Sequence, residues 1–396
     1  MQTKLYSYID PSLSSTNIGP LADITVLLQP NMSVRGWPTE AGSAALENYL
    51  ALEDATAVGR LRNDGATIIG SGRMAELGLG LAGDTTAEIL AGDKCDLALV
   101  TDTMGEARLS ALSAGRPGFK PSYGIISRSG LIGLVPSMEC CGIAAGTTER
   151  IMAVLESLSG EDERDPSMRR GVGLDFTREG EASDSAVPVG IIREWIDDLP
   201  PRKKEAFNTS LSRLEKSGGR IEEVSLPDFD LFRPVHNIIG AVEASSAAGK
   251  YDSVRYGHRA ADTENWNEMY LKSRAESFGP TVKSYLFQGA YFQFEDFTAF
   301  TNACRVRRRL CRELEKLFEK VDLLAGPARR LDTDAAAGTV EEIYEAFAHT
   351  LPANVAGLPS ICIPGSEAGS STDPGLQLLG PPLSDPRLIS FAGRIG

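Results

Sequence analysis

The sequence predicts an α/β protein in which a mixed central β-sheet is covered by helices on both faces. Short apolar runs that suit buried strands alternate with longer stretches whose apolar residues recur at helical spacing, and glycine or proline stands between them. This alternation is typical of α/β architecture. The 396 residues are 42% hydrophobic and 24% charged, as in ordinary globular chains. A chain of this length can bury a large core without disulfide bridges.

The first part of the chain begins with an apolar run that Pro30 stops, which predicts a strand. A stretch of small and apolar residues at helical spacing then predicts a helix, and Gly65 separates it from the next apolar run. The predicted elements are strands at 24–28, 66–69 and 97–100, helices at 41–62 and 149–158, and a glycine- and proline-rich loop at 115–124.

The second part of the chain continues the same alternation. The helix predicted at 201–217 has proline near its start and Gly218 and Gly219 after its end, which is the expected punctuation. The helix predicted at 297–320 carries leucine and phenylalanine on one stripe. The other predicted elements are strands at 187–192, 221–226, 322–325, 360–363 and 376–379, and a helix at 339–356.

One strongly charged stretch, residues 161–184, contains almost no large apolar side chains. It is the best candidate for a linker between an N-terminal half, 1–160, and a C-terminal half, 185–396. We therefore expect a single domain over residues 1–396 that is built from two halves.

The formal net charge of −14 argues against direct nucleic-acid binding, because a surface that follows phosphates needs a basic patch. The run 305–309, with four arginines, is the exception. We interpret it as a solvated helix face, although a local basic patch stays open. No stretch approaches the roughly 18 apolar residues that a membrane helix needs, so we expect no membrane insertion.

Six scattered cysteines without a C-x-x-C pair suit reduced thiols, and the polar first 20 residues do not resemble a signal peptide. We therefore expect a cytoplasmic protein. His236, His258 and His349 are far apart in the sequence, with no zinc-type spacing. We predict no metal site and no cofactor.

Several motifs occur in a fixed order between about residues 19 and 385. They are GWPT (36–39), AGS (41–43), RLR (60–62), KPSYG (120–124), EASS (243–246), YDSVRYG (251–257), PANVAGLP (352–359) and GLQLLG (375–380). Together they resemble the amidase signature family, and most closely its branch of glutamyl-tRNA(Gln) amidotransferase A subunits. The resemblance implies the amidase signature fold over one amidase-like domain.

The resemblance also implies a chemistry, in which a serine nucleophile, a bridging serine and a lysine cleave an amide. A serine hydroxyl needs a base within hydrogen-bond reach, and a lysine of lowered pKa supplies it. Here the lysine position holds Gln29, the nucleophile position holds Glu106, and the bridging position holds Ala82, or Leu81 if the alignment slips by one residue. Met104 replaces a glycine of the turn whose N–H groups would hold the oxyanion.

These three replacements predict a degenerate catalytic triad at Gln29, Ala82 and Glu106, with no catalytic residues of the family's kind. Triad members act as a unit, so one loss already removes most of the rate. The main expectation is therefore a catalytically inactive pseudoamidase, a pseudoenzyme that acts by binding a ligand or a partner.

The substrate side is altered as well. Phe347 falls at or near the place where the resembling branch has an acidic residue that holds the amino group of glutamine. Arg307 resembles the family's carboxylate-binding arginine and Tyr291 its pocket tyrosine, so both are predicted ligand-binding residues for a small amide or amino acid. Arg307 can equally be one more surface arginine on a basic helix.

A relocated nucleophile is the alternative. Glu106 could attack as a carboxylate, and Cys140 and Cys141 stand at a place that the resemblance puts beside the active site. A serine- or cysteine-directed probe that labelled Cys140, Cys141 or Ser137 would favour this alternative. The simpler interpretation is an ion-paired or solvated Glu106 and buried, inert cysteines.

Three functional hypotheses follow. The first is the pseudoamidase, and the second is an active amidase or amidotransferase subunit with relocated catalytic residues. The third is a structural subunit of a larger assembly, with a protein partner or a second copy of the chain, because the sequence starts almost at its first core strand and could leave apolar surface exposed.

Overall fold

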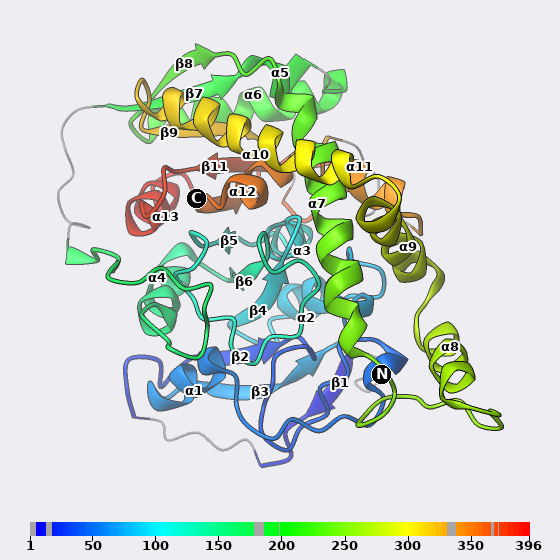
Figure 1. Ribbon diagram of the computed structural model, residues 1–396. Helices are drawn as coiled ribbons and strands as arrows, with labels where there is room; N and C mark the ends of the chain where they lie inside the picture. The colour runs from blue at the N-terminus through cyan, green and yellow to red at the C-terminus, as the bar shows by residue number, and fades with distance from the viewer. Residues whose placement is uncertain are drawn as a thin grey trace.

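A computed structural model describes residues 5–12, 18–177, 186–197, 199–330, 338–365, 368–370 and 372–396. Within them, one mixed sheet of 11 strands runs through the whole molecule (Figure 1). From one edge to the other the strands are β1 (Tyr6–Ile9), β3 (Thr67–Gly72), β2 (Thr25–Leu28), β4 (Leu97–Asp102), β6 (Cys140–Ala145), β5 (Gly118–Lys120), β10 (Ser360–Ile363), β11 (Leu376–Leu379), β9 (Leu323–Pro327), β7 (Val187–Ile192) and β8 (Gly219–Val224).

Helices cover both faces of this sheet, which confirms the predicted fold class (Figure 1). The helices are α1 (Thr56–Asn63), α2 (Thr86–Ala91), α3 (Glu106–Ser113), α4 (Thr148–Leu158), α5 (Arg193–Asp197), α6 (Pro201–Lys216), α7 (Phe232–Ala247), α8 (Trp266–Ser277), α9 (Pro280–Phe294), α10 (Phe297–Phe318), α11 (Val340–Phe347), α12 (Leu351–Ala356) and α13 (Asp385–Gly393).

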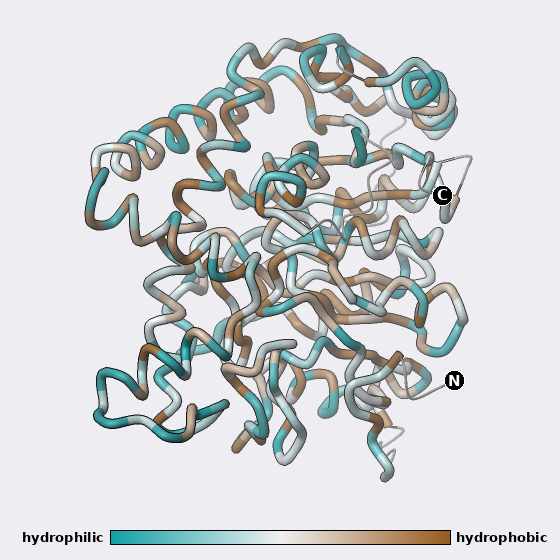
Figure 2. The backbone as a smooth tube through the Cα atoms, turned by 90° about the vertical axis from the view of Figure 1, so that its right-hand side faces the viewer, coloured by the Kyte–Doolittle hydropathy of each residue, from teal (hydrophilic) through white to brown (hydrophobic). Residues whose placement is uncertain are grey.

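Neighbouring residues of each strand face opposite sides of the sheet, so the core divides into layers. Leu97 and Leu99 of β4 join the layer under α1, α4, α6 and α13. Ala98 and Val100 join a smaller layer under α2 and α3. A third and larger layer lies under α7 and α9 to α12. Hydrophobic residues concentrate along the central strands, and hydrophilic residues lie mostly on the outer segments (Figure 2).

The two predicted halves share the sheet. Strand β5 pairs antiparallel with β10, with Lys120 opposite Ser360, so strands from both halves lie side by side. Residues 161–177 of the expected linker pack on the N-terminal half, where Arg60 donates to the carbonyl of Glu161 and Ser127 donates to Asp162. Residues 178–184 lie outside the described residues. The division into halves stays a prediction.

The single helix expected at 41–62 is wrong. Only a short 3₁₀ helix at Ala44–Leu46 and α1 form there. Ala41 and Asn48 have φ angles of 48° and 61°, which lie in the left-handed region and end any regular helix. Side-chain periodicity alone could not show these turns.

Two other expectations fail for related reasons. The helix expected at 339–356 is two helices, α11 and α12, because Pro352 lacks an N–H group and starts a new helix. The loop expected at 115–124 contains β5, whose pairing with β6 and β10 depends on distant parts of the chain. Most other predicted elements appear within a few residues of their predicted bounds.

Across the described residues, none of the helices combines the length and the apolar character that crossing a bilayer requires.

Candidate functional site

The turn between β4 and α3 holds the side chain of Glu106, the first residue of α3. Its carboxylate oxygen Oε2 accepts backbone N–H bonds from Thr103, Met104 and Gly105, at 2.7, 2.8 and 3.1 Å. Such convergent N–H groups form an anion-binding nest. Glu106 is buried, so its carboxylate fills the nest from inside the protein. The amides that the sequence resemblance assigns to an oxyanion are therefore occupied by the protein's own side chain.

The protonation of Glu106 reflects opposing effects. Burial and the nearby Asp102 carboxylate raise the pKa of Glu106 to about 8, although the three N–H bonds favour the charged form. The other oxygen, Oε1, is buried and has no hydrogen-bond partner within the described residues. Three bonds hold the group in place, and Oε2 could attack a substrate only by giving them up.

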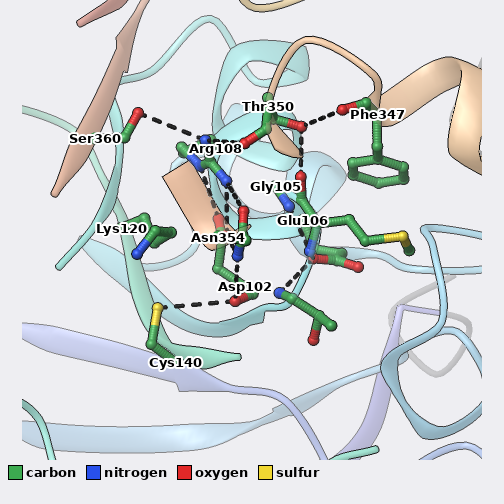
Figure 3. A network of polar contacts seen from close by, with 12 residues as sticks. Asp102, Gly105, Glu106, Arg108, Lys120, Cys140, Phe347, Thr350, Asn354 and Ser360 are labelled. Carbon is green, nitrogen blue, oxygen red and sulfur yellow. Dashed lines mark hydrogen bonds and ion pairs between the residues drawn. The ribbon is translucent and has the colours of Figure 1, made fainter. Parts of the chain in front are cut away.

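A buried ion pair lies beside this turn (Figure 3). The Arg108 guanidinium donates from Nε and Nη2 to the two carboxylate oxygens of Asp102, at 3.1 and 2.9 Å. Burial alone would raise the pKa of Asp102, but the Arg108 charge and hydrogen bonds hold that pKa below its ordinary value. Both side chains are fully buried, so each charge depends on the other.

The remaining Arg108 donors extend the pair into a network across four elements, and Figure 3 shows the part of it that reaches Thr350 and Asn354. Arg108 donates to the Thr350 carbonyl at 3.0 Å and to Gln377 Oε1 at 2.6 Å, and it also donates to Asn354. Asn354 in turn donates to the Asp102 carbonyl at 3.0 Å. The network therefore joins β4 and α3 to α12 and β11.

Gly105 shows how tightly the turn is enclosed. Its φ angle is 136°, which side chains rarely adopt, and a Cβ there would lie 2.3 Å from Thr350 Oγ1. The Thr350 hydroxyl donates to the Met104 carbonyl, so the residue that excludes a side chain at 105 also fixes the turn.

Gln29 follows the last residue of β2 and lies beside the same turn. Its Nε2 donates to Asp84 Oδ2 at 2.8 Å, and its Oε1 accepts the Thr101 N–H at 2.9 Å. Gln29 is buried, and both ends of its amide are satisfied. A carboxamide so held does not accept a proton at neutral pH, so it supplies no base to this site.

Asp84 is a site residue that the sequence reasoning missed. It accepts from Gln29 and, through Oδ1, from the Thr86 N–H at 2.8 Å, just before α2 begins. Burial raises the pKa of Asp84, and its hydrogen bonds oppose that shift. An aspartate directly before two threonines is a helix-start signal that could have drawn attention to it. Ala82, the predicted bridging position, is exposed in the preceding loop.

Lys120 is the lysine that lies beside the buried ion pair, and it is also buried (Figure 3). Its ammonium donates to the carbonyl of Pro121 at 2.8 Å, and burial lowers its pKa. The neighbouring Ser122 hydroxyl donates to Asp385 at 2.6 Å. The Lys120 ammonium therefore bonds a backbone carbonyl and the Ser122 hydroxyl bonds a carboxylate, rather than each other.

The cysteine alternatives lie in strand β6. The Cys140 thiol donates to the Asp102 carbonyl at 3.8 Å, and burial raises its pKa to about 12. Burial likewise raises the pKa of Cys141 well above its ordinary value. A thiol nucleophile needs the opposite shift, because the thiolate is the reactive form. All six cysteines are free thiols.

A second polar chain, also missed from the sequence, starts at the turn. The ring of His236 on α7 contacts the Thr103 carbonyl at 3.0 Å through Nε2 and the Tyr344 hydroxyl at 2.9 Å through Nδ1. The Tyr285 hydroxyl lies 2.8 Å from that of Tyr344. Burial lowers the pKa of His236 to about 4, so the ring is neutral at pH 7. A histidine within the apolar stripe of α7 was the available signal.

Arg307 lies on α10, half-buried. It donates from Nε to the Val355 carbonyl at 2.8 Å and from its two terminal nitrogens to the hydroxyl and the carbonyl of Ser137, both at 2.9 Å. Because Val355 follows Asn354 in α12, Arg307 is anchored to the helix that supports the Glu106 turn. These bonds distinguish Arg307 from its exposed neighbours on α10. Its role in ligand binding stays a prediction.

Tyr291 lies on the outer side of α9. It is 54% exposed, and its ring packs against Phe292 with the ring centroids 5.6 Å apart. The structure thus places Gln29 against β4 at Thr101, two residues before the turn that holds Glu106, and it anchors Arg307 to α12, whereas Ala82 and Tyr291 are exposed. The ligand-binding role of Tyr291 stays a prediction.

Within the described ranges, no group of three or more histidine, cysteine, aspartate or glutamate side chains could hold a metal ion. The site offers a bound carboxylate, a satisfied amide and a neutral imidazole. It can accept hydrogen bonds and hold a fixed shape.

A family model described as Amidase matches residues 4–89 and 86–389 of the chain. The chain is similar to the A subunit of glutamyl-tRNA(Gln) amidotransferase from Natronomonas pharaonis, with 33% identity, 96% of this chain and 96% of that protein covered. It is also similar to the protein of the same name from Haloarcula marismortui, with 30% identity and 98% of each covered.

Among solved structures, the fold is similar to that of the A subunit of glutamyl-tRNA(Gln) amidotransferase from Thermotoga maritima. The TM-score is 0.79 at 24% identity, with 98% of this chain and 86% of that chain covered. A structure described as an amidase gives a TM-score of 0.79 at 23% identity, with 100% and 92% covered. At these identities the structural likeness supports the fold.

Proposed function

Since this chain belongs to the amidase family, we propose that it resembles the A subunits of amidotransferases in its role but does not cleave amides through a serine and a lysine. In this proposal it is a cytoplasmic pseudoamidase that works by binding a protein partner or a small amide or amino-acid ligand. A role as a structural subunit of a larger assembly is compatible with it.

The occupied nest carries the proposal. The three N–H groups of the β4–α3 turn already bind the Glu106 carboxylate. A substrate carbonyl would have to displace a buried charged or hydrogen-bonding group to reach them, and it would find no serine there to attack it. Gln29, held by Asp84 and the Thr101 N–H, offers no proton acceptor in compensation.

A second candidate is an active amidase or amidotransferase subunit with relocated catalytic residues. The comparisons favour it, because the named relatives are amidotransferase subunits and the chain matches two of them along almost their whole length. The intact network around Arg108 also keeps the turn in a defined shape. A group such as Glu106, whose pKa lies near neutrality, is suited in principle to acid–base work.

The test is ammonia release by the purified chain, alone and with any proteins that co-purify. Glutamine, asparagine and a simple arylamide serve as substrates, and Glu106→Gln is the matched variant. The proposal expects no turnover above the buffer blank in either protein. Turnover that Glu106→Gln abolishes would overturn the proposal and support the second candidate.

Turnover that survives Glu106→Gln would also overturn the proposal, and it would show that a group other than Glu106 carries the activity. In that case a serine- or cysteine-directed probe, followed by peptide mapping, locates the nucleophile. An adduct on Ser137, Cys140 or Cys141 supports relocation. Circular dichroism of each variant confirms that it is folded before its activity is compared.

A further inference from the structure

An exposed aromatic stripe lies along α9 and the start of α10. The exposed fractions are 73% for Phe287, 54% for Tyr291, 81% for Phe294 and 58% for Phe297. The first three follow one another at helical spacing of four and three residues, so their side chains share one face of α9. Scattered exposed apolar residues are normal, but a row of four large rings is unusual for a free surface.

The turn between the helices joins the fourth ring to the other three. The N–H groups of Glu295 and Asp296 both donate to the Tyr291 carbonyl, at 2.8 and 3.0 Å. The Asp296 carboxylate caps α10 by accepting the Ala299 N–H at 3.1 Å, so α10 starts at Phe297 without an intervening loop. Only the two-residue turn at 295–296 therefore separates Phe297 from the rings of α9.

The orientation of α9 is fixed by its other face. Val282, Tyr285 and Leu286 are buried there. Gly289 approaches α7 so closely that a Cβ would lie 1.9 Å from the Ala241 carbonyl oxygen. The helix cannot rotate to bury the aromatic stripe without losing these contacts, so burial has to come from another molecule.

Three arginines continue the surface along α10. Arg308 follows Phe297 by about three helical turns and so lies on the same stripe, with Arg305 and Arg312 beside it. All three are exposed. Arg305 donates to Asn302 at 3.3 Å, whereas Arg308 and Arg312 form no ion pair with any described residue. In a chain of net charge −14, a row of uncompensated arginines is a local exception.

We propose that these residues form a docking surface for an acidic amphipathic helix of another protein. We call it the aromatic–arginine surface, and it consists of Phe287, Tyr291, Phe294, Phe297, Arg305, Arg308 and Arg312. The apolar side of such a helix would bury the rings, and its acidic residues would pair with the arginines. Aromatic residues and arginine are also the types that dominate binding energy at protein interfaces.

Charge argues against a second copy of the chain as the occupant. A second copy that docked through the same surface would bring the two arginine rows close together, and like charges at an interface oppose association. An acidic helix with apolar residues fits both the rings and the arginines.

The proposal is tested with a synthetic helical peptide that has leucine on one face and glutamate elsewhere. Fluorescence anisotropy follows its binding to the full-length chain. We expect saturable binding whose affinity falls as the salt concentration rises. Phe294→Ser and Arg308→Glu should each lower the affinity for the peptide at least tenfold. Leu52→Ser and Arg220→Glu change exposed residues elsewhere and should leave the affinity unchanged. The same peptide with lysine in place of glutamate should not bind.

Other outcomes would overturn the proposal. The proposal is wrong if the acidic peptide does not bind, or if it binds with an affinity that neither Phe294→Ser nor Arg308→Glu lowers. A dimer in sedimentation that Phe294→Ser dissociates would identify a second copy as the occupant, and displacement of the peptide by single-stranded RNA would identify a nucleic acid. None of these measurements depends on Glu106, so the proposal fails or stands separately from the proposed loss of amide hydrolysis.

Discussion

The Arg108 network and the Glu106 turn differ in what they require of the chain. The network joins Asp102 and Arg108 to groups more than 200 residues away, in α12 and β11. The turn satisfies Glu106 through N–H groups of the three preceding residues. The network is a long-range arrangement in which each charge needs several partners, whereas the turn is a local one.

Under our proposal that Glu106 stands in place of a serine, this difference explains how one position could change without a change in the Arg108 network. A buried ion pair is strongly destabilised when one partner is removed, because the other charge stays uncompensated. A residue at the start of a helix can be replaced by any side chain that accepts the local N–H bonds. Glu106 meets that requirement, so the proposed replacement of a serine by a carboxylate would need no change in the network.

The largest predicted effect therefore comes from the network. Arg108→Leu removes the guanidinium and leaves Asp102 as a buried, unpaired carboxylate. We expect the free energy of unfolding to fall by about 3–5 kcal/mol. Urea denaturation followed by circular dichroism measures it.

Arg116→Leu is the matched control for this substitution. Arg116 pairs with the mostly exposed Asp93, and exposed ion pairs contribute about 0–1 kcal/mol. If the free energy of unfolding fell by similar amounts in the two variants, the buried network would stabilise the protein no more than an exposed ion pair does.

The turn itself should be less sensitive. Glu106→Ala leaves the N–H groups of Thr103, Met104 and Gly105 buried without their acceptor. The expected loss is about 1–3 kcal/mol, and Glu106→Gln, which keeps a carbonyl oxygen, should lose less. The same denaturation measurement compares the two. If alanine were as stable as glutamine here, the N–H bonds to Glu106 would contribute little to the turn.

Much of this contrast is visible in the sequence. Gln29 and Glu106 can be assigned to the positions that the resemblance gives to a lysine and a serine, because the surrounding motifs of glycine, proline and arginine fix the register; that they replace a catalytic pair stays a prediction. Most strands can be found as well, because buried strands are continuous apolar runs. The family and the fold follow from these same residues.

Contacts between distant residues could not be predicted. Nothing in the sequence shows that Asp84 would accept from Gln29, or that His236 and Tyr344 would meet beside Thr103. These contacts depend on how loops and helices pack, and side-chain periodicity does not encode that packing. The φ angle of Ala41, which interrupts the helix expected at 41–62, has no side-chain signal either.

The pH dependence of stability provides a sharper test of the turn. The pKa of Glu106 is raised to about 8, so between the ordinary glutamate range and pH 8 the folded state binds a proton that the unfolded state has lost. The contribution of Glu106 to the free energy of unfolding is therefore present at low pH. It is lost as the pH rises through this range, by up to about 1.4 kcal/mol per pH unit.

The measurement is the difference in unfolding free energy between the wild type and Glu106→Gln from pH 5 to pH 8. We expect the wild type to lose stability relative to the variant as pH increases. Because His236 and His349 have pKa values lowered to about 4 and 3, they act in the opposite direction, mainly toward the acidic end. Both proteins contain them, so their contribution cancels in the difference. A flat difference would mean that Glu106 is charged throughout.

The smallest predicted effect concerns Gln29 and Asp84. A double-mutant cycle with Gln29→Leu, Asp84→Ala and the double variant isolates their contact from the other bonds that each residue makes. We expect a coupling of about 0.5–1.5 kcal/mol, the usual range for one hydrogen bond. A coupling above about 3 kcal/mol would place this pair with the Arg108 network instead. Gln29 would then be as constrained as the Arg108 network, which would contradict the proposal that a lysine was replaced here without a change in its surroundings.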